Sequence, residues 1–154
     1  TAQETLSKAI HELRALWKSL HREWLHQFNL LQNLENEIDR ANSAHVVQIQ
    51  FHTRAKSLPL APEAQVMLFR IIQESNNNCI RHAKANHIDV NIDFNEQITV
   101  TIADDGLGFP IKDSSHRGVG IINMQHRTLL LSGTITWKTA EGNGTEIKIS
   151  LPVQ

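Results

Sequence analysis

Apolar residues in the first part of the chain recur at alternating spacings of three and four. Residues 4–40 contain neither proline nor glycine, which favours a long helical segment. The apolar seam of this segment is typical of a coiled coil or a helical bundle and consists of Ile10, Leu13, Trp17, Leu20 and Trp24. Such a seam needs a partner, either a second chain or a preceding helix. The apolar pattern then shifts its phase, which predicts a break near residues 27–29 and a second, shorter helix.

Beyond residue 42 the pattern changes between a period of two and a helical period. Period-two alternation predicts strands at residues 45–51, 88–94, 98–104, 134–139 and 145–151, and the helical pattern predicts helices at residues 63–83 and 119–131. This order predicts an α+β fold, a two-layer α/β sandwich with a mixed sheet and its helices on one face, preceded by an N-terminal helical stalk. We therefore expect a stalk over residues 1–41 and a second domain over residues 42–154.

Composition narrows the classes of function. The chain has 15 Lys and Arg against 16 Asp and Glu, so no basic field favours nucleic acid or an anionic membrane. The single cysteine, Cys79, excludes an internal disulfide and is interpreted as a buried structural thiol in a reducing compartment. No apolar run approaches the ~20 residues of a membrane helix. Because the chain starts at Thr1 and not at a methionine, we expect it to be a cytoplasmic fragment of a longer protein. An inner-membrane location of the full-length protein stays open.

Three separated segments carry oxygen donors or glycines in patterns that suit a nucleotide. Glu74 and Asn78 lie four residues apart on the expected helix 63–83, so a carboxylate and an amide point the same way. The run DDGLG at residues 104–108 ends a strand, and GVG at residues 118–120 opens a helix whose free N–H groups can face a phosphate. Taken singly, the helical pair is typical of a solvated face, and the glycine runs are typical of ordinary turns.

Together, in this order and spacing, the segments resemble the N, G1 and G2 boxes of the Bergerat-type (GHKL) ATPases. The resemblance is greatest to sensor histidine kinases paired with LuxR-like (NarL-type) response regulators, and it covers residues 45–153. The N box is matched by Gln73, Glu74, Asn78, Arg81, His82 and Ala83. The later motifs are matched by Asp104, Gly106, Gly108 and Phe109, by Gly118, Gly120, Ile121, Met124 and Arg127, and by Leu131, Gly133, Thr134, Gly142, Gly144 and Thr145.

The resemblance implies a nucleotide site with defined roles. Asp104 would accept a hydrogen bond from adenine, Asn78 would hold Mg²⁺, and Glu74 would be the catalytic acid/base. The residues that the resemblance assigns to ATP binding are Asn78, Arg81, His82, Asp104, Gly106, Gly108, Phe109, Gly118, Val119, Gly120, Ile121 and Thr145. Further candidate phosphate neighbours, for which a solvated surface role remains open, are Lys112, His116 and Arg117.

The implied function is that of the ATP-binding catalytic domain of a two-component sensor histidine kinase. Such a domain transfers the γ-phosphoryl group of ATP to a histidine for relay to a response regulator. Residues 1–41 would be the C-terminal part of the dimerisation and histidine-phosphotransfer hairpin plus a linker helix. The implied partners are these hairpin helices, a response regulator with a LuxR-like DNA-binding domain and, in the full-length protein, a second copy. We expect no contact with nucleic acid or with a membrane.

Three departures from the family pattern bear on this hypothesis. The usual acceptor histidine has no counterpart, and His11 and His21 fall in the wrong helix by register. Residues 20–30 lack the usual proline and glycine, which favours a more continuous helix in place of a bend. Asn76 stands where an apolar residue is usual, so it either loosens the packing of its helix or lies exposed. The alternatives are a GHKL-type protein serine kinase or anti-sigma-like regulator, a non-catalytic nucleotide-binding module, and a structural coiled-coil adaptor.

Overall fold

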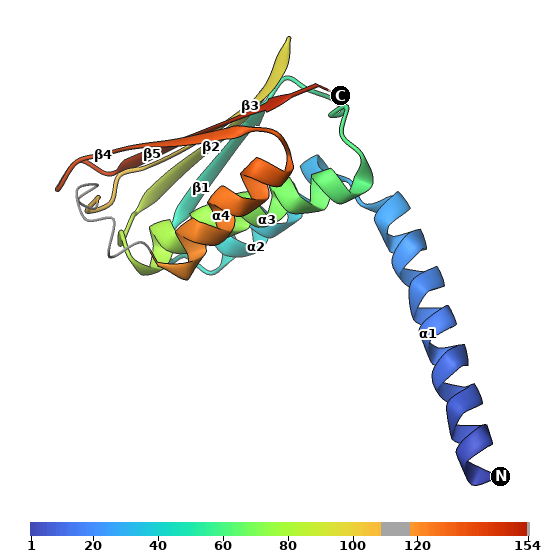
Figure 1. The fold of residues 1–154 in the computed structure, drawn as a ribbon. Helices are drawn as coiled ribbons and strands as arrows, with labels where there is room; N and C mark the ends of the chain where they lie inside the picture. The colour runs from blue at the N-terminus through green and yellow to red at the C-terminus, as the bar shows by residue number, and fades with distance from the viewer. Residues whose placement is uncertain (109–117, 154) are drawn as a thin grey trace.

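Helices and strands alternate along the chain in the predicted order. The computed structural model describes residues 1–108 and 118–153. Its elements are α1 (Ala2–Gln27), α2 (Leu30–Ser43), β1 (Gln48–Thr53), α3 (Pro62–Arg81), β2 (His87–Phe94), β3 (Gln97–Asp104), α4 (Val119–Leu130), β4 (Thr134–Thr139) and β5 (Thr145–Pro152). Figure 1 shows that α1 extends from a body in which the other elements form two layers.

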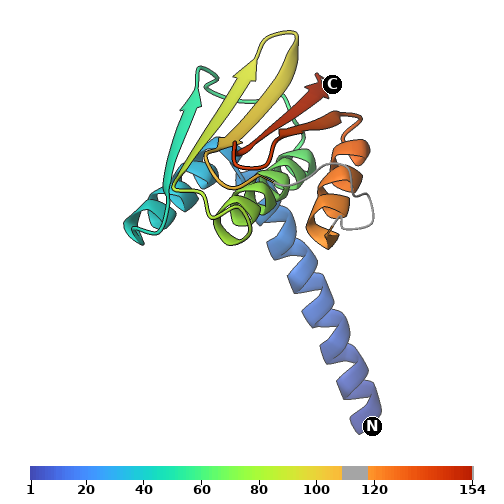
Figure 2. The ribbon, with the colours of Figure 1, turned by 90° about the vertical axis from the view of Figure 1, so that its left-hand side faces the viewer.

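The sheet is mixed, as predicted. Its strand order is β1-β2-β3-β5-β4, with β1 parallel to β2 and the other neighbouring strands antiparallel. Two hairpins, β2–β3 and β4–β5, account for two of these pairs. Figures 1 and 2 show α2, α3 and α4 together on one face of the sheet. The prediction of a two-layer sandwich with its helices on one face is therefore confirmed.

Alternate residues of the central strands form the core beneath the helices. Those of β2 and β3 are at most 1% exposed and are Ile88, Val90, Ile92, Ile98, Val100 and Ile102. α3 covers them with Leu68, Ile71 and Ile72, which are 0% exposed. Full burial of one such side chain contributes about 1.5–3 kcal/mol. The contact between α3 and the sheet is therefore a large source of stability, and it fixes the helix that carries the N-box residues.

The N-terminal helical segment divides at Phe28 and Asn29, where the sequence predicted a break. Both residues have extended backbone conformations, with ψ of 121° and 113°. The Asn29 side chain caps α2 by accepting the Gln32 N–H at 3.0 Å. The expectation of a more continuous helix was wrong, because an extended Phe28 and a capping asparagine redirect the chain without a proline or a glycine.

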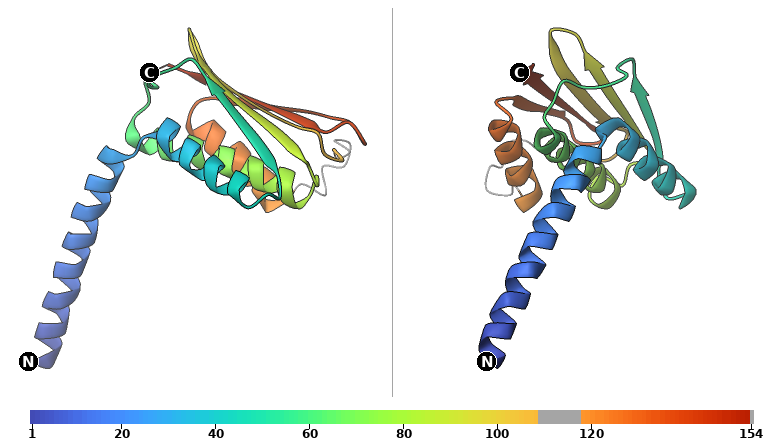
Figure 3. Two further views of the ribbon diagram at one scale, coloured as in Figure 1. Left: turned by 180° about the vertical axis from the view of Figure 1, so that it is seen from behind. Right: turned by 90° about the vertical axis from the view of Figure 1, so that its right-hand side faces the viewer.

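α2 packs into the body, whereas α1 extends from it (Figure 3). Leu30, Leu34 and Ile38 of α2 are at most 5% exposed and belong to the core. Gln65 of α3 accepts the Leu30 N–H at 3.1 Å and so fastens the start of α2. All residues of α1 are described, and none of them is buried. The packing thus separates α1 from the body at residues 28 and 29, whereas the sequence placed the division after residue 41.

Ring contacts run along α1 and onto α3. Trp17 stacks on His21 with ring centroids 4.9 Å apart, and His21 stacks on Trp24 at 5.9 Å. Trp24 contacts Phe28 at 5.3 Å, and Phe28 meets Phe69 of α3 edge-on at 5.6 Å. The remaining residues of the seam, Ile10, Leu13 and Leu20, are exposed, as are the apolar side chains of Leu6 and Leu16. Within the two described ranges, no helix has both the length and the apolar character that crossing a membrane requires.

β1 occupies residues Gln48–Thr53, later than the predicted 45–51. His45 adopts a left-handed conformation with φ of 55° in the turn after α2, so regular pairing cannot begin there. Asn42 of α2 accepts the Ile49 N–H at 2.7 Å and donates to the Ile49 carbonyl at 2.9 Å. The start of the strand is therefore set by a tertiary contact, which the alternating pattern could not reveal.

Asn76 is buried in α3, with 6% of its surface exposed. Its Oδ1 atom has no hydrogen-bond partner among the described residues. A buried acceptor that loses its water without gaining a partner costs about 1–3 kcal/mol. Of the two possibilities left open by the sequence, exposure is excluded, and the unpaired Oδ1 makes the burial of this side chain unfavourable.

Replacing Asn76 with leucine should stabilise the fold. Asn76→Leu keeps the branched shape and removes the unsatisfied acceptor, so we expect the free energy of unfolding to rise by about 1 kcal/mol or more. Urea denaturation followed by circular dichroism measures this change. The neighbouring Asn77 is exposed, so Asn77→Leu is the matched control and should have little effect. A loss of stability in Asn76→Leu would contradict the prediction.

Candidate functional site

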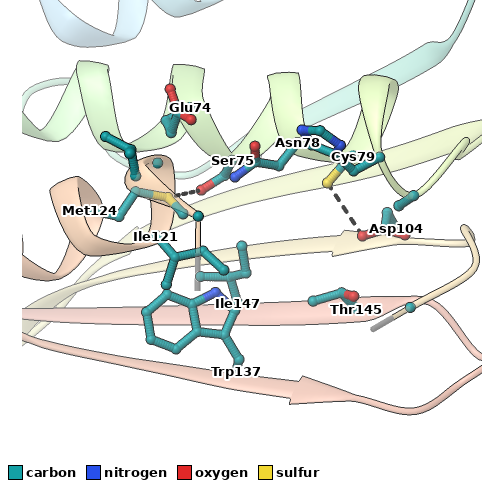
Figure 4. A pocket seen from close by; sticks show the side chains of 16 residues that line it. Glu74, Ser75, Asn78, Cys79, Asp104, Ile121, Met124, Trp137, Thr145 and Ile147 are labelled. Atoms are coloured by element: carbon teal, nitrogen blue, oxygen red, sulfur yellow. Dashed lines mark hydrogen bonds between the residues drawn. The ribbon is translucent and has the colours of Figure 1, made fainter. Parts of the chain in front are cut away.

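A cavity of about 400 Å³ lies between the helix layer and one end of the sheet (Figure 4). It is formed where α3, the end of β3, the start of α4 and the β4–β5 hairpin meet. The residues that line it are Glu74, Ser75, Asn78, Cys79, His82, Ala83, Asp104, Gly108, Gly118, Val119, Gly120, Ile121, Met124, Trp137, Thr145 and Ile147. The three segments that the sequence singled out therefore converge on one cavity.

α3 supplies one edge of the cavity. Glu74, Asn78 and His82 are spaced by four residues, so their side chains follow one line along the helix. Ser75 lies further round the helix and is buried, and its hydroxyl donates to the Ile71 carbonyl at 2.9 Å. The same hydroxyl lies 3.2 Å from the Met124 sulfur of α4. This contact joins the two helices at the cavity wall.

Asp104, at the end of β3, has both carboxylate oxygens engaged. Oδ1 accepts the Gly106 N–H at 2.7 Å, and Oδ2 accepts the Cys79 thiol at 3.3 Å. Burial of Cys79, together with the negative charge of Asp104, raises the pKa of the thiol, so Cys79 stays protonated and donates. The carboxylate is thereby held in one orientation at the cavity, with lone pairs left for a ligand.

Two glycines allow the cavity walls to approach each other. Gly108 has φ of 66°, and a side chain there would collide with the Ala140 carbonyl. A Cβ atom at Gly120 would collide with the Glu74 carboxylate. The first turn of α4 therefore lies directly against the acidic residue of α3, and a side chain at position 120 would displace the Glu74 carboxylate.

The N-terminus of α4 is open toward the cavity. Gly118 is the N-cap residue, and no side chain caps the helix. The first N–H groups of a helix have no partner within the helix, and the helix dipole adds partial positive charge there. Gly118, Val119 and Gly120 all line the cavity close to Glu74 and Asn78. This end of the cavity therefore suits an anion such as phosphate.

The loop after β3 is fastened by Asp105. Its Oδ1 accepts the Asn86 and His87 N–H groups at 2.8 and 2.9 Å, and its Oδ2 lies 2.8 Å from His87 Nδ1. These hydrogen bonds, above all that from the His87 N–H, lower the pKa of Asp105 from 3.8 to about 2. The carboxylate thus ties the end of β3 to the start of β2 and holds Asp104 beside it in place.

Ten of the predicted site residues line the cavity: Glu74, Asn78, His82, Asp104, Gly108, Gly118, Val119, Gly120, Ile121 and Thr145. Arg81 and Gly106 do not line it. Arg81 is exposed, and Gly106 acts from behind the carboxylate by donating to Asp104. Phe109 lies outside the described residues, as do Lys112, His116 and Arg117.

Two further lining residues, Ala83 and Met124, belong to the matched motifs but were not assigned to ATP binding. The lining residues that no motif indicated are Ser75, Cys79, Trp137 and Ile147. Burial of Cys79 was expected and is observed, at 4% exposure, but its contact with Asp104 depends on tertiary packing. A signal did exist for Ile147, which lies two residues after Thr145 and hence on the same face of β5. Trp137 pairs with Ile147 across the hairpin and could have been found from the same alternation.

The fold and the cavity together define a two-layer α+β sandwich whose cavity lies between the helices and one end of the sheet. The chain matches the family model described as "Histidine kinase-, DNA gyrase B-, and HSP90-like ATPase" over residues 63–154. The chain therefore belongs to this ATPase family, as its motifs predicted.

Curated relatives are similar over nearly the whole chain. The histidine-protein kinase/phosphatase DegS of Brevibacillus brevis is 27% identical over 152 residues, 98% of this chain and 39% of the relative. The nitrate/nitrite sensor protein NarQ of Escherichia coli is 32% identical over 153 residues, 96% of this chain and 26% of the relative. The chain thus spans 26–39% of the length of these relatives. Its ATPase domain is of the sensor histidine kinase type.

A solved structure shares the fold. The ATP-binding domain of PrrB from Mycobacterium tuberculosis superposes with a TM-score of 0.66 at 15% sequence identity. The match covers 82% of this chain and 96% of that one. The sandwich described above is therefore the fold of a histidine kinase ATP-binding domain.

The hydrogen bonds of Asp105 predict how stability depends on pH. Because the pKa of Asp105 is lower in the folded protein, its contribution is fully present above its ordinary pKa of 3.8 and is lost as the pH falls toward about 2. Denaturation in urea from about pH 5 to about pH 2.5 should show a steeper acid loss in the wild-type chain than in Asp105→Asn. An identical pH dependence of the two chains would contradict the assignment.

Proposed function

We propose that this chain is the catalytic part of a two-component sensor histidine kinase. It binds ATP with Mg²⁺ and transfers the γ-phosphoryl group to a histidine that this chain does not supply. One observation carries the proposal: Asp104, Asn78, Glu74 and the start of α4 line one cavity although they come from separate elements. Each of these groups matches a chemical need of the reaction, as follows.

The base end of the proposed site lies at Asp104. Its carboxylate accepts a hydrogen bond from the exocyclic amine of adenine. The Gly106 N–H and the Cys79 thiol hold the carboxylate in position for this contact. Guanine presents a carbonyl oxygen at the same ring position, so two acceptors would then face each other. A site that is built to accept a hydrogen bond rejects a base that cannot donate it. We therefore infer a preference for ATP over GTP.

The phosphate end of the proposed site lies between Asn78, His82 and the first turn of α4. The uncapped N-terminus of α4 donates N–H groups to phosphate oxygens. The Asn78 amide oxygen fits Mg²⁺ as a single protein ligand, with phosphates and waters completing the shell. In this proposal the ion is held jointly by Asn78 and the phosphates. The described ranges contain no cluster of three or more His, Cys, Asp or Glu side chains suited to a metal. Bound there, Mg²⁺ supplies charge neutralisation at the phosphates.

Glu74 is assigned the role of acid/base. Its half-buried carboxylate lies one helical turn from Asn78 and directly against Gly120, so it borders the phosphate end. From this position it accepts a hydrogen bond from the remote N–H of an incoming imidazole and directs the other ring nitrogen toward the γ-phosphoryl group. Positioning and charge neutralisation supply the rest of the catalysis, as phosphoryl transfer generally requires.

The exposed seam of α1 supports the kinase over the other functions considered. An anti-sigma-type serine kinase shares the cavity but has no need for such a helix, and a non-catalytic module has no need for Glu74. We infer that α1 packs against the histidine-phosphotransfer helices of the parent kinase and, in the full-length homodimer, against a second copy. The inferred recipient of the phosphoryl group is a response regulator with a LuxR-like DNA-binding domain, in the cytoplasm.

Replacing Asp104 with asparagine tests the base assignment. Asp104→Asn loses a charged acceptor, so we expect ATP to bind about 100-fold more weakly while the circular dichroism spectrum is unchanged. Titration with a fluorescent, non-hydrolysable ATP analogue, with and without Mg²⁺, measures the affinity. Asp89 lies exposed on β2, and Asp89→Asn is the matched control. Equal affinity of Asp104→Asn and the control would refute the assignment.

Replacing Glu74 with glutamine tests the catalytic assignment. Glu74→Gln keeps the size of the side chain, so ATP binding should persist, whereas transfer to an acceptor hairpin supplied in trans should slow by about 100-fold or more. Single-turnover transfer from radiolabelled ATP measures this rate. Glu96, exposed in the β2–β3 turn, provides the control variant Glu96→Gln. If Glu74→Gln transfers at the control rate, the acid/base role is wrong.

A further inference from the structure

Glu74 places a negative charge at the end of the cavity that is proposed for the phosphates. Its carboxylate lies against Gly120 in the first turn of α4, one helical turn along α3 from Asn78. Figure 4 shows that Glu74 and Asp104 lie at different ends of the cavity. The Glu74 side chain is half-buried, so it is screened less by water than a surface carboxylate. A phosphate at the start of α4 would therefore have this carboxylate beside it.

The described residues supply no full positive charge that neutralises Glu74. None of the ion pairs between described residues includes it. The described lining of the cavity contains the carboxylates of Glu74 and Asp104 and no lysine or arginine. The N-terminus of a helix contributes only about half an elementary charge. The charge of Glu74 thus offsets the attraction that the start of α4 offers to a phosphate.

Bound Mg²⁺ changes this balance. Free ATP is strongly anionic, and a bound Mg²⁺ neutralises part of the charge on its phosphates. Like charges that face each other in a binding site cost affinity, so a carboxylate there discriminates between the two forms of ATP. Asn78 offers the ion an oxygen without adding charge. The phosphate end therefore combines a residue suited to the metal complex with a residue that repels the metal-free triphosphate.

We propose that Glu74 is a specificity-determining residue for the charge of the nucleotide, whose carboxylate excludes metal-free ATP and admits the Mg²⁺ complex. The inference rests on the proposed function, since it takes the phosphates to lie at the start of α4. It gives Glu74 a role in the binding step, separate from its acid/base role in transfer. Asn78 strengthens binding of the metal complex, whereas Glu74 weakens binding of the form without metal.

The test measures the affinity of the wild-type chain and of Glu74→Gln for ATP by titration calorimetry, once in excess Mg²⁺ and once in EDTA. Glu74→Gln removes the charge and keeps the size, so it should bind metal-free ATP about tenfold more tightly than the wild-type chain does. In Mg²⁺ the substitution should change the affinity by less than about threefold, because the ion already offsets the phosphate charge. No gain in EDTA, or an equal gain in both conditions, overturns the proposal.

Two control variants separate charge from other effects. Glu74→Asp keeps the carboxylate and should keep most of the difference between the affinities in Mg²⁺ and in EDTA. Asn78→Ala removes the oxygen assigned to the ion, so it should weaken ATP binding in Mg²⁺ and leave binding in EDTA unchanged. A loss of the difference in Glu74→Asp as large as that in Glu74→Gln means that the charge is not the cause, and it overturns the proposal.

Metal-free ADP provides a test on the wild-type chain alone, which stays decisive if Glu74→Gln fails to fold. ADP lacks the terminal phosphate and is repelled less, so in EDTA it should bind about threefold or more tightly than ATP. Equal binding of the two nucleotides in EDTA overturns the proposal and leaves the proposed function intact. Failure of the wild-type chain to bind ATP in Mg²⁺ overturns both.

Discussion

The site depends on how the backbone after β3 turns back against the end of α3. The Leu107 N–H donates to the Ala83 carbonyl at 2.8 Å, and Gly106 leaves no room for a side chain between Ala83 and Asp104. Backbone groups make this contact, with Asp105 fastening the other side of the turn. Because Ala83 follows the C-cap residue of the helix that carries Asn78, the same turn sets the separation between the carboxylate and the helical edge.

α3 serves the core and the cavity at once. One face holds Leu68 and Ile72 against the sheet, and an adjacent edge presents Glu74 and Asn78 to the cavity. Cys79 serves both the core and the cavity, since it is buried and its thiol also donates a hydrogen bond to Asp104. The position of the cavity edge is therefore determined by core packing. A change that shifts α3 on the sheet displaces Glu74 and Asn78 together, and it moves the Cys79 thiol relative to Asp104.

The sequence predicted what depends on local pattern. Periodicity located the helices and the hairpins, and motif spacing located ten lining residues, because spacing along a helix or strand fixes direction. The start of β1 was misplaced because it depends on Asn42, a residue of another element. The packing of α2 was missed because a bundle helix and a core helix share one apolar pattern. Trp137 was missed because no motif includes it, although the alternation of the β4–β5 hairpin places it beside Ile147.

The thin connection between α1 and the body has a mechanical consequence. α1, a helix of 26 residues, meets the body only near its C-terminal end, where it contacts α3 and where its C-cap residue Phe28 packs on Phe69. Such a helix is about 39 Å long, so a swing of about 10° at Phe28 moves its far end by about 7 Å. A large displacement at Thr1 would therefore reach α3, the helix that carries Glu74, as a much smaller movement near Phe69.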